Sequence, residues 1–163
     1  MLTYDKLVAA FRECGLEKGD VVHIQGNLRR IGPVDTAPER ESILEFYLSA
    51  IQEVIRPEGT LSVLTPFFDY GRYGTPFIRE ETPSQGGVFS EYIRTRPGAV
   101  RSLHPIFSLT ALGHLAEDIC GKDHYSSYGW HSPWTELYKR NAKIIALGLG
   151  TNPGGTTIMH YIE

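Results

Sequence analysis

The chain has 163 residues, of which 41% are hydrophobic and 21% are charged, a composition that excludes a disordered or fibrous protein. A formal net charge of −3 at pH 7 argues against a protein that coats nucleic acid, and no apolar run is long enough to span a membrane. Its two cysteines cannot form the disulfide framework of a secreted protein. We therefore expect a cytoplasmic protein that forms a single domain over residues 1–163.

Helices and strands alternate along the first part of the chain. An amphipathic helix is predicted to begin after Thr3 and to end at Gly15, a residue type that commonly ends helices. The β-rich run at 21–24 predicts a buried strand. Apolar residues spaced for one helix face predict a second helix within 38–56, and the next strand follows at 61–64. This alternation is typical of a layered α/β domain.

The later elements are shorter and are separated by irregular segments. Residues 69–87 show no clear period, and loops of that length are often functional. The elements predicted after this loop are a helix from 88, a strand with its approaches over 101–113, helices at 115–120 and from 132, a strand at 143–148, and the beginning of a helix after the glycine-rich loop 150–155.

His160 is the strongest candidate for acid–base chemistry. It follows a glycine-rich turn after a buried strand, where α/β folds place reacting groups. Glu163 lies three residues further on, so on a helix its carboxylate could hold the imidazole in one tautomer. A surface His–Glu pair without function is the alternative. The metalloprotease pattern is absent and the cysteines are not spaced for a metal, so no metal site is expected.

Two basic segments could bind an anion. The run 101–105 combines Arg101, Ser102 and His104 beside Pro105, which suits a phosphate or carbonyl ligand. An arginine at the sheet edge with a histidine packed on proline explains the same run equally well. Arg29 and Arg30 lie in the glycine-bounded loop 26–32, which either cradles an anion or is a solvated turn.

Several segments together carry a likeness to one family. They are residues 19–22 with 28–32, then 57–61, 83–94, 101–108, 132–133, 143–148 and 156–163. In this order they resemble the aminoglycoside 3-N-acetyltransferase family, and the likeness covers essentially the whole chain. The R-S-x-H-P-x-x-S block at 101–108 and the H-x-x-E ending at 160–163 are specific in combination.

The resemblance implies a three-layer α/β/α fold with a mixed sheet, acetyl-CoA as the donor and an aminosugar amine as the acceptor. It implies that His160 is the general base of a direct transfer and that Glu163 orients it. It places along the CoA groove Leu28, Arg29, Ile31, Arg101, Ser102, His104, Pro105 and Ser108. Asp69 belongs to the loop expected to contact the cationic acceptor. No nucleic-acid or membrane partner is expected, and a homo-oligomer is left open.

The chain departs from the family pattern in three places. Gln25, Gly26 and Asn27 stand where the family usually has a histidine and two serines, which removes two hydroxyls near the expected thioester. Ile106 and Phe107 replace a more polar pair, so the acceptor need not be an antibiotic. Family members also continue past the H-x-x-E motif. We therefore expect a C-terminally truncated domain that is inactive, or nearly so, by itself.

Two other hypotheses follow from the residues. The first is a CoA- or partner-binding homologue that has lost catalysis, which the replaced serines and the expected truncation favour. The second is a hydrolase that uses His104 and Ser108, although no G-x-S-x-G motif is present. The hydrolase requires these two side chains to lie within hydrogen-bonding distance of each other.

Overall fold

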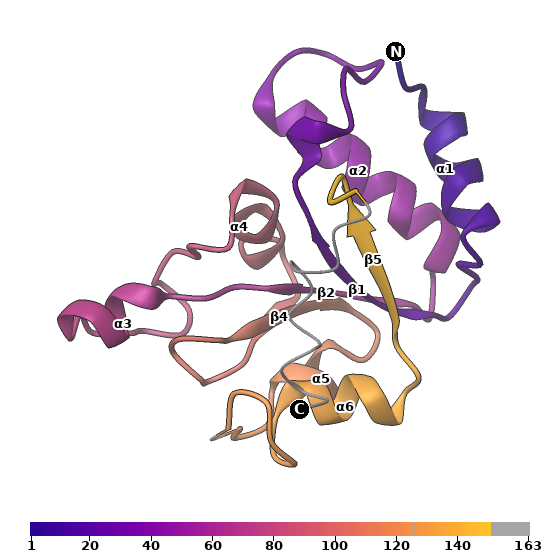
Figure 1. Cartoon of the computed structure of the whole chain (residues 1–163). Helices are drawn as coiled ribbons and strands as arrows, with labels where there is room; N and C mark the ends of the chain where they lie inside the picture. Colours follow the sequence, from indigo (N-terminus) through magenta and orange to yellow (C-terminus); the bar gives the residue numbers. More distant parts are fainter. Residues whose placement is uncertain (125, 151–163) are drawn as a thin grey trace.

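The computed structural model describes residues 1–124 and 126–150, and within them one mixed sheet organises the fold (Figure 1). Its strands are β1 (Val21–Gly26), β2 (Thr60–Leu64), β3 (Ala99–Arg101), β4 (Leu109–Gly113) and β5 (Lys143–Leu147). The strand order is β3-β4-β2-β1-β5. Strand β1 runs parallel to both β2 and β5, whereas β4 is antiparallel to both β2 and β3.

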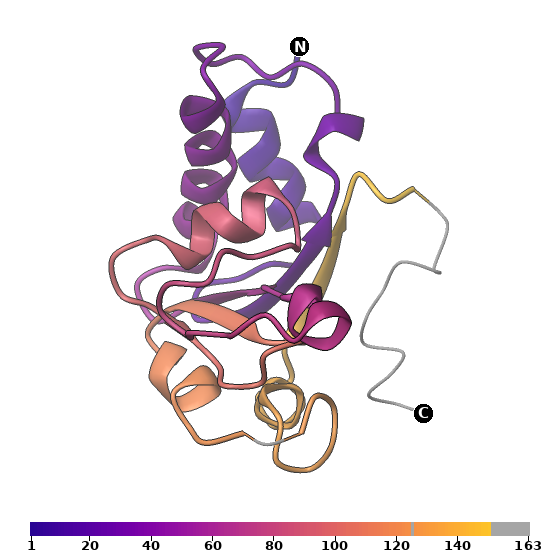
Figure 2. The ribbon, with the colours of Figure 1, turned by 90° about the vertical axis from the view of Figure 1, so that its left-hand side faces the viewer.

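Helices cover both faces of this sheet. The helices of the described residues are α1 (Tyr4–Glu13), α2 (Arg40–Ile55), α3 (Phe68–Tyr73), α4 (Val88–Arg94), α5 (Ala116–Cys120) and α6 (Pro133–Lys139), with a short 3-10 helix at Leu28–Arg30. Figures 1 and 2 show α1, α2 and α4 on one side of the strands and α5 and α6 on the other. The predicted three-layer α/β/α fold with a mixed sheet is therefore confirmed. Within the described ranges, no helix has the length and apolarity needed to cross a bilayer.

The alternation of side chains along β1 divides the core into two parts. Val22 and Ile24 belong to the cluster formed with α1, α2 and α4. Successive side chains of a strand point to opposite faces of the sheet. His23 therefore points to the other face, where its ring meets the edge of Trp134 with 4.7 Å between ring centroids. A histidine thus occupies the centre of the α5–α6 side of the sheet, where it is completely buried.

The ends of α1 follow local sequence rules. The Thr3 hydroxyl accepts a hydrogen bond from the Lys6 amide at 3.4 Å, which satisfies one of the free amides of the first turn. The helix ends at Glu13, and Gly15 then adopts a positive φ of 85°, which glycine tolerates. The predicted helix from Thr3 to Gly15 is confirmed.

The middle of the chain differs from the prediction at one place. The segment 69–87 is not a continuous loop, because its beginning belongs to α3, which is too short to show a helical period and is followed by Gly74 with a φ of 68°. The strand predicted with its approaches over 101–113 is β4, which occupies the end of that segment. The approach to it begins at Arg101, the last residue of β3, so the R-S-x-H-P block connects two antiparallel strands.

Candidate functional site

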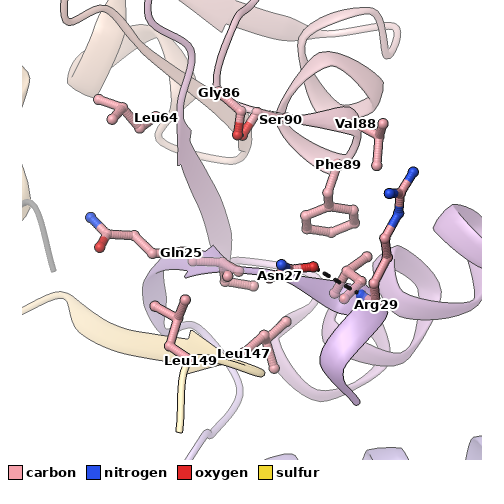
Figure 3. Close-up of a pocket in the computed structure, with 14 residues that line it drawn as sticks. Gln25, Asn27, Arg29, Leu64, Gly86, Val88, Phe89, Ser90, Leu147 and Leu149 are labelled. Atoms are coloured by element: carbon pink, nitrogen blue, oxygen red, sulfur yellow. Dashed lines mark hydrogen bonds between the residues drawn. The ribbon is translucent and has the colours of Figure 1, made fainter. Parts of the chain in front are cut away.

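A pocket of about 490 Å³ opens where β1, β2 and β5 end (Figure 3). Its walls come from the end of β1, from the 3-10 helix after it, from Leu147 and Leu149 at the end of β5, and from the segment 86–90 at the start of α4. Ligands of α/β sheets commonly bind beyond the carboxyl ends of parallel strands. The parallel ends of β1 and β5 place this pocket in such a position.

Two glycines allow the ends of β1 and β5 to approach closely beside the pocket. A side chain at Gly26 would overlap the carbonyl group of Leu147, and one at Gly148 would overlap the carbonyl of Asn27. The Asn27 amide donates to the Leu147 carbonyl at 2.8 Å, which holds the two chain segments together. The glycine at position 26 is therefore required by the close approach of β5, and this packing leaves no room for the serine that the family usually has there.

The residues after Gly26 shape one side of the pocket. The Asn27 side-chain oxygen accepts from the Arg29 amide at 3.2 Å and caps the 3-10 helix. Leu28 and Arg29 both line the pocket, and Figure 3 shows the Arg29 side chain extending toward Val88. Ile31, which the family likeness places in the same groove, instead packs against the core under α1 and α2.

Arg101 lies inside the protein, not on the pocket wall. Its side chain is 5% exposed, and its guanidinium donates to the Ser108 hydroxyl at 2.9 Å, to the Thr65 carbonyl at 2.7 Å and to the Thr82 carbonyl. Burial lowers the pKa of Arg101 to about 10, so it stays charged at neutral pH. The Ser102 hydroxyl, also buried, accepts from the Leu109 amide at 2.9 Å. These side chains hold the β3–β4 connection and the segment before α4 against the end of β2.

His104 and Ser108 have separate partners. The His104 Nδ1 atom accepts from the Phe107 amide at 3.1 Å, and its Nε2 atom lies 2.9 Å from the Ser127 hydroxyl. Because Nδ1 accepts a backbone N–H, the ring proton belongs on Nε2. The Ser108 hydroxyl donates to the Thr65 carbonyl at 2.5 Å. The hydrolase hypothesis, which needs a hydrogen bond between His104 and Ser108, is therefore wrong.

The remaining predicted residues lie apart from this pocket or outside the described part of the chain. Asp69 is in the first turn of α3, where it is partly exposed. The Pro105 carbonyl accepts from the Phe67 amide at 3.2 Å and so fixes the loop beside α3. His160 and Glu163 fall outside the described residues.

Sequence reasoning missed one wall of the pocket. Gly86, Phe89 and Ser90 line it at the start of α4, opposite the end of β1. A side chain at Gly86 would crowd the Leu64 carbonyl oxygen, at 2.6 Å, so this glycine permits a close approach to the end of β2. The Gly86-Gly87 pair just before a predicted helix was the signal that could have identified this wall.

Comparison with known proteins gives a consistent result. The family model described as aminoglycoside 3-N-acetyltransferase matches residues 21–163. Aminoglycoside N(3)-acetyltransferase III from Salmonella sp is 27% identical over an alignment that takes in 100% of this chain and 60% of that protein. Aminoglycoside N(3)-acetyltransferase VII from Streptomyces paromomycinus is also 27% identical, with 99% of this chain and 60% of that protein covered. The chain thus spans about 60% of the length of these curated relatives.

Solved structures share the fold. AAC-IIIb, solved as a binary complex with CoASH, has a TM-score of 0.81 and 25% identity, covering 98% of this chain and 63% of that one. AAC-VIa, solved with sisomicin bound, has a TM-score of 0.82 and 25% identity over the same shares. Together with the family match over most of its length, these similarities show that the chain belongs to the aminoglycoside 3-N-acetyltransferase family.

Proposed function

We propose that this chain forms the donor-binding part of a cytoplasmic N-acetyltransferase, which moves the acetyl group of acetyl-CoA to an amino group of an aminosugar. The observation that carries the proposal is the pocket at the ends of β1 and β5, in a member of this family whose relative AAC-IIIb was solved with CoASH.

The walls of the pocket suit the end of a CoA molecule. Leu28, Leu64 and Phe89 provide apolar surface for methylene groups, while Gln25 adds a side-chain amide. Arg29 offers the forked set of donors that binds phosphate well. The arm of CoA alternates methylene and amide groups and leads to phosphates. Its apolar, polar and charged parts therefore match these walls.

We assign the residues predicted for the CoA groove to two roles. Leu28 and Arg29 contact the donor, because they line the pocket. The others keep the frame of the site in place through the packing and hydrogen bonds described above; they are Ile31, Arg101, Ser102, His104, Pro105 and Ser108.

We propose His160 as the general base and Glu163 as the carboxylate that orients it, since a histidine titrates near neutral pH. The neutral amine attacks the thioester carbonyl carbon, a C–N bond forms, and the C–S bond breaks. His160 takes the proton lost by nitrogen and returns it to the departing thiolate, so the products are an N-acetyl amine and CoA thiol. No enzyme nucleophile is needed, and positioning in a ternary complex supplies much of the rate. Asp69 contributes negative charge toward the cationic acceptor.

One observation favours a second candidate function. The backbone contact at Gly26 leaves no space for a hydroxyl-bearing side chain, and the Asn27 side chain is engaged as a helix cap. A homologue that binds CoA or a partner without transferring acetyl groups would tolerate both changes.

The test combines binding with turnover. CoA binding is measured by calorimetry, and thiol release from acetyl-CoA is measured with a panel of aminosugars, for residues 1–163 and for any longer product of the same gene. We expect amine-dependent release that His160→Ala reduces at least about a hundredfold, while His114→Ala, at an exposed histidine, leaves it unchanged. Binding without release in every product would favour the non-catalytic homologue. Absence of CoA binding would reject the acetyltransferase and the CoA-binding homologue alike, and would leave only a homologue that binds a partner.

A further inference from the structure

Asn27, the residue that follows β1, uses most of its polar groups to fix the backbone beside the pocket. Its main-chain amide donates to the Leu147 carbonyl at 2.8 Å, and its main-chain carbonyl accepts from the Arg30 amide at 3.0 Å. Its side-chain oxygen accepts from the Arg29 amide at 3.2 Å. Within the described residues, the side-chain NH₂ group has no hydrogen-bond partner, so its two donors are available to a ligand.

The hydrogen bond to Arg29 determines which way the Asn27 amide faces. A backbone N–H can bond only to the oxygen of a side-chain amide, so the oxygen must face Arg29 and the nitrogen must face away from it. In Figure 3 the dashed line joins this oxygen to Arg29, and the nitrogen lies on the other side of the group. A serine hydroxyl can rotate and can either donate or accept. Asn27 instead presents donors in a fixed direction.

The position of Asn27 makes these donors part of the pocket wall. The residue is exposed and lines the pocket together with the apolar side chains of Leu28, Phe89 and Leu147. A ligand that displaces water here leaves the donors unpaired, at a cost in binding free energy, unless it carries an acceptor. A carbonyl oxygen is a neutral acceptor, and the arm of the proposed donor carries such oxygens in its amides and in the acetyl thioester. The wall therefore favours a ligand of this chemistry.

We propose that the NH₂ group of Asn27 donates a hydrogen bond to a carbonyl oxygen in the arm of acetyl-CoA, which makes Asn27 a specificity-determining residue for the donor. This inference rests on the proposed function and names the group that selects the arm. The replacement of the family's serine by Asn27 then exchanges one hydrogen-bond donor for another. The departure from the family pattern at this position does not by itself remove donor binding.

The first test observes the NH₂ group directly. In a nitrogen-15 NMR spectrum of residues 1–163, the side-chain signals of Asn27 are assigned by their absence in Asn27→Asp. We expect acetyl-CoA to shift these signals, and 3′,5′-ADP, which lacks the arm, to leave them in place. If bound acetyl-CoA leaves the signals unshifted, or if 3′,5′-ADP shifts them equally, the inference is overturned.

The second test measures the contact with the donor. Asn27→Asp keeps an oxygen that caps the 3-10 helix, because Asp and Asn cap helices about equally well, and it replaces the NH₂ group by an acceptor. We expect the acetyl-CoA affinity to fall at least about tenfold more than the 3′,5′-ADP affinity. Repulsion of phosphates by the added charge is common to both ligands. Asn141→Asp makes the same change in the turn between α6 and β5 and, as the matched control, should leave the ratio of the two affinities unaltered.

Binding of CoA distinguishes the two sources of the carbonyl oxygen. Equal losses for CoA and acetyl-CoA in Asn27→Asp assign the contact to an amide of the arm, whereas a loss confined to acetyl-CoA assigns it to the thioester. If Asn27→Asp does not fold, Asn27→Gly removes the donors without adding a charge and should weaken acetyl-CoA binding about threefold to tenfold relative to 3′,5′-ADP.

The outcomes separate this inference from the proposed function. Unchanged acetyl-CoA affinity in a folded variant, or equal losses for acetyl-CoA and 3′,5′-ADP, would overturn the role of Asn27 while the proposed function stands. If the unaltered chain binds neither CoA nor acetyl-CoA, the proposed function fails and the contact of Asn27 with the donor fails with it.

Discussion

Replacing Arg101 by lysine decides whether this residue serves the fold or the donor. The guanidinium donates to the carbonyls of Thr65 and Thr82 and to the hydroxyl of Ser108. A lysine ammonium keeps the charge but lacks the planar fork, so it can replace only part of this set. Each hydrogen bond to a charged group contributes about 1.5–3 kcal/mol, and the loss of two predicts a decrease of about 3–6 kcal/mol in the free energy of unfolding.

The assay is urea unfolding followed by circular dichroism, combined with CoA titration under conditions where the variant is folded. We expect Arg101→Lys to lower the free energy of unfolding and to leave the CoA affinity of the folded protein within about twofold, because hydrogen bonds inside the protein and not contacts with CoA are lost. Arg12→Lys is the control, since its pair with Glu53 at 3.5 Å is exposed and contributes under about 1 kcal/mol.

The opposite pattern would refute this reasoning. If Arg101→Lys unfolds at the urea concentration of the unaltered protein but binds CoA tenfold more weakly, Arg101 contacts the donor as the family likeness implied. The buried hydrogen bonds would then be dispensable for stability.

Two further predictions concern packing and pH. Gly26→Ser should destabilise the protein by about 1–3 kcal/mol because its side chain overlaps the Leu147 carbonyl, and it should not increase acetyl transfer; an unchanged melting temperature would contradict the close approach. Burial raises the pKa of Glu136, but hydrogen bonds from Arg140 and Lys122 outweigh it and bring the pKa to about 2. A depressed folded-state pKa stabilises the protein above about pH 4.5, and this stabilisation, about 2–3 kcal/mol, is lost as the pH falls toward 2. Glu136→Gln should therefore remove this loss of stability at low pH in urea unfolding. Glu58→Gln, in an exposed pair with Lys18, is the control and should leave it in place. Equal effects of the two variants would show that the contacts of Glu136 do not stabilise the fold.

Much of the fold could be predicted because its signals are local. The Thr3 cap, the apolar spacing within α2 and the β-rich runs of β1, β2 and β5 each act over a few residues. The helix α3 and the three-residue strand β3 are too short to show a period in the sequence. A six-residue helix that begins without a side-chain cap leaves little trace in a sequence.

The site could be predicted only in part for a different reason. Leu28 and Arg29 line the pocket as expected, since they follow directly from a strand end. A sequence does not tell whether the guanidinium of Arg101 binds a ligand or the protein itself, because its donors are the same in both cases. The fold shows that they bind the carbonyls of Thr65 and Thr82. The wall at Gly86 is formed by backbone, which has no chemical signature in a list of side chains.

The replacements at Gln25, Gly26 and Asn27 are better explained as one rearrangement than as decay. Gly26 admits the close approach of β5, and Asn27 caps the helix that follows. The side-chain nitrogen of Gln25 lies 3.2 Å from Nε2 of the buried His23. Decay of a site usually leaves buried polar groups without partners. In the described part of the chain, the buried side-chain atoms that lack a partner belong to other residues, none of them at the end of β1. Because each replacement is accommodated by its neighbours, restoring one serine alone should disturb the packing at the end of β1.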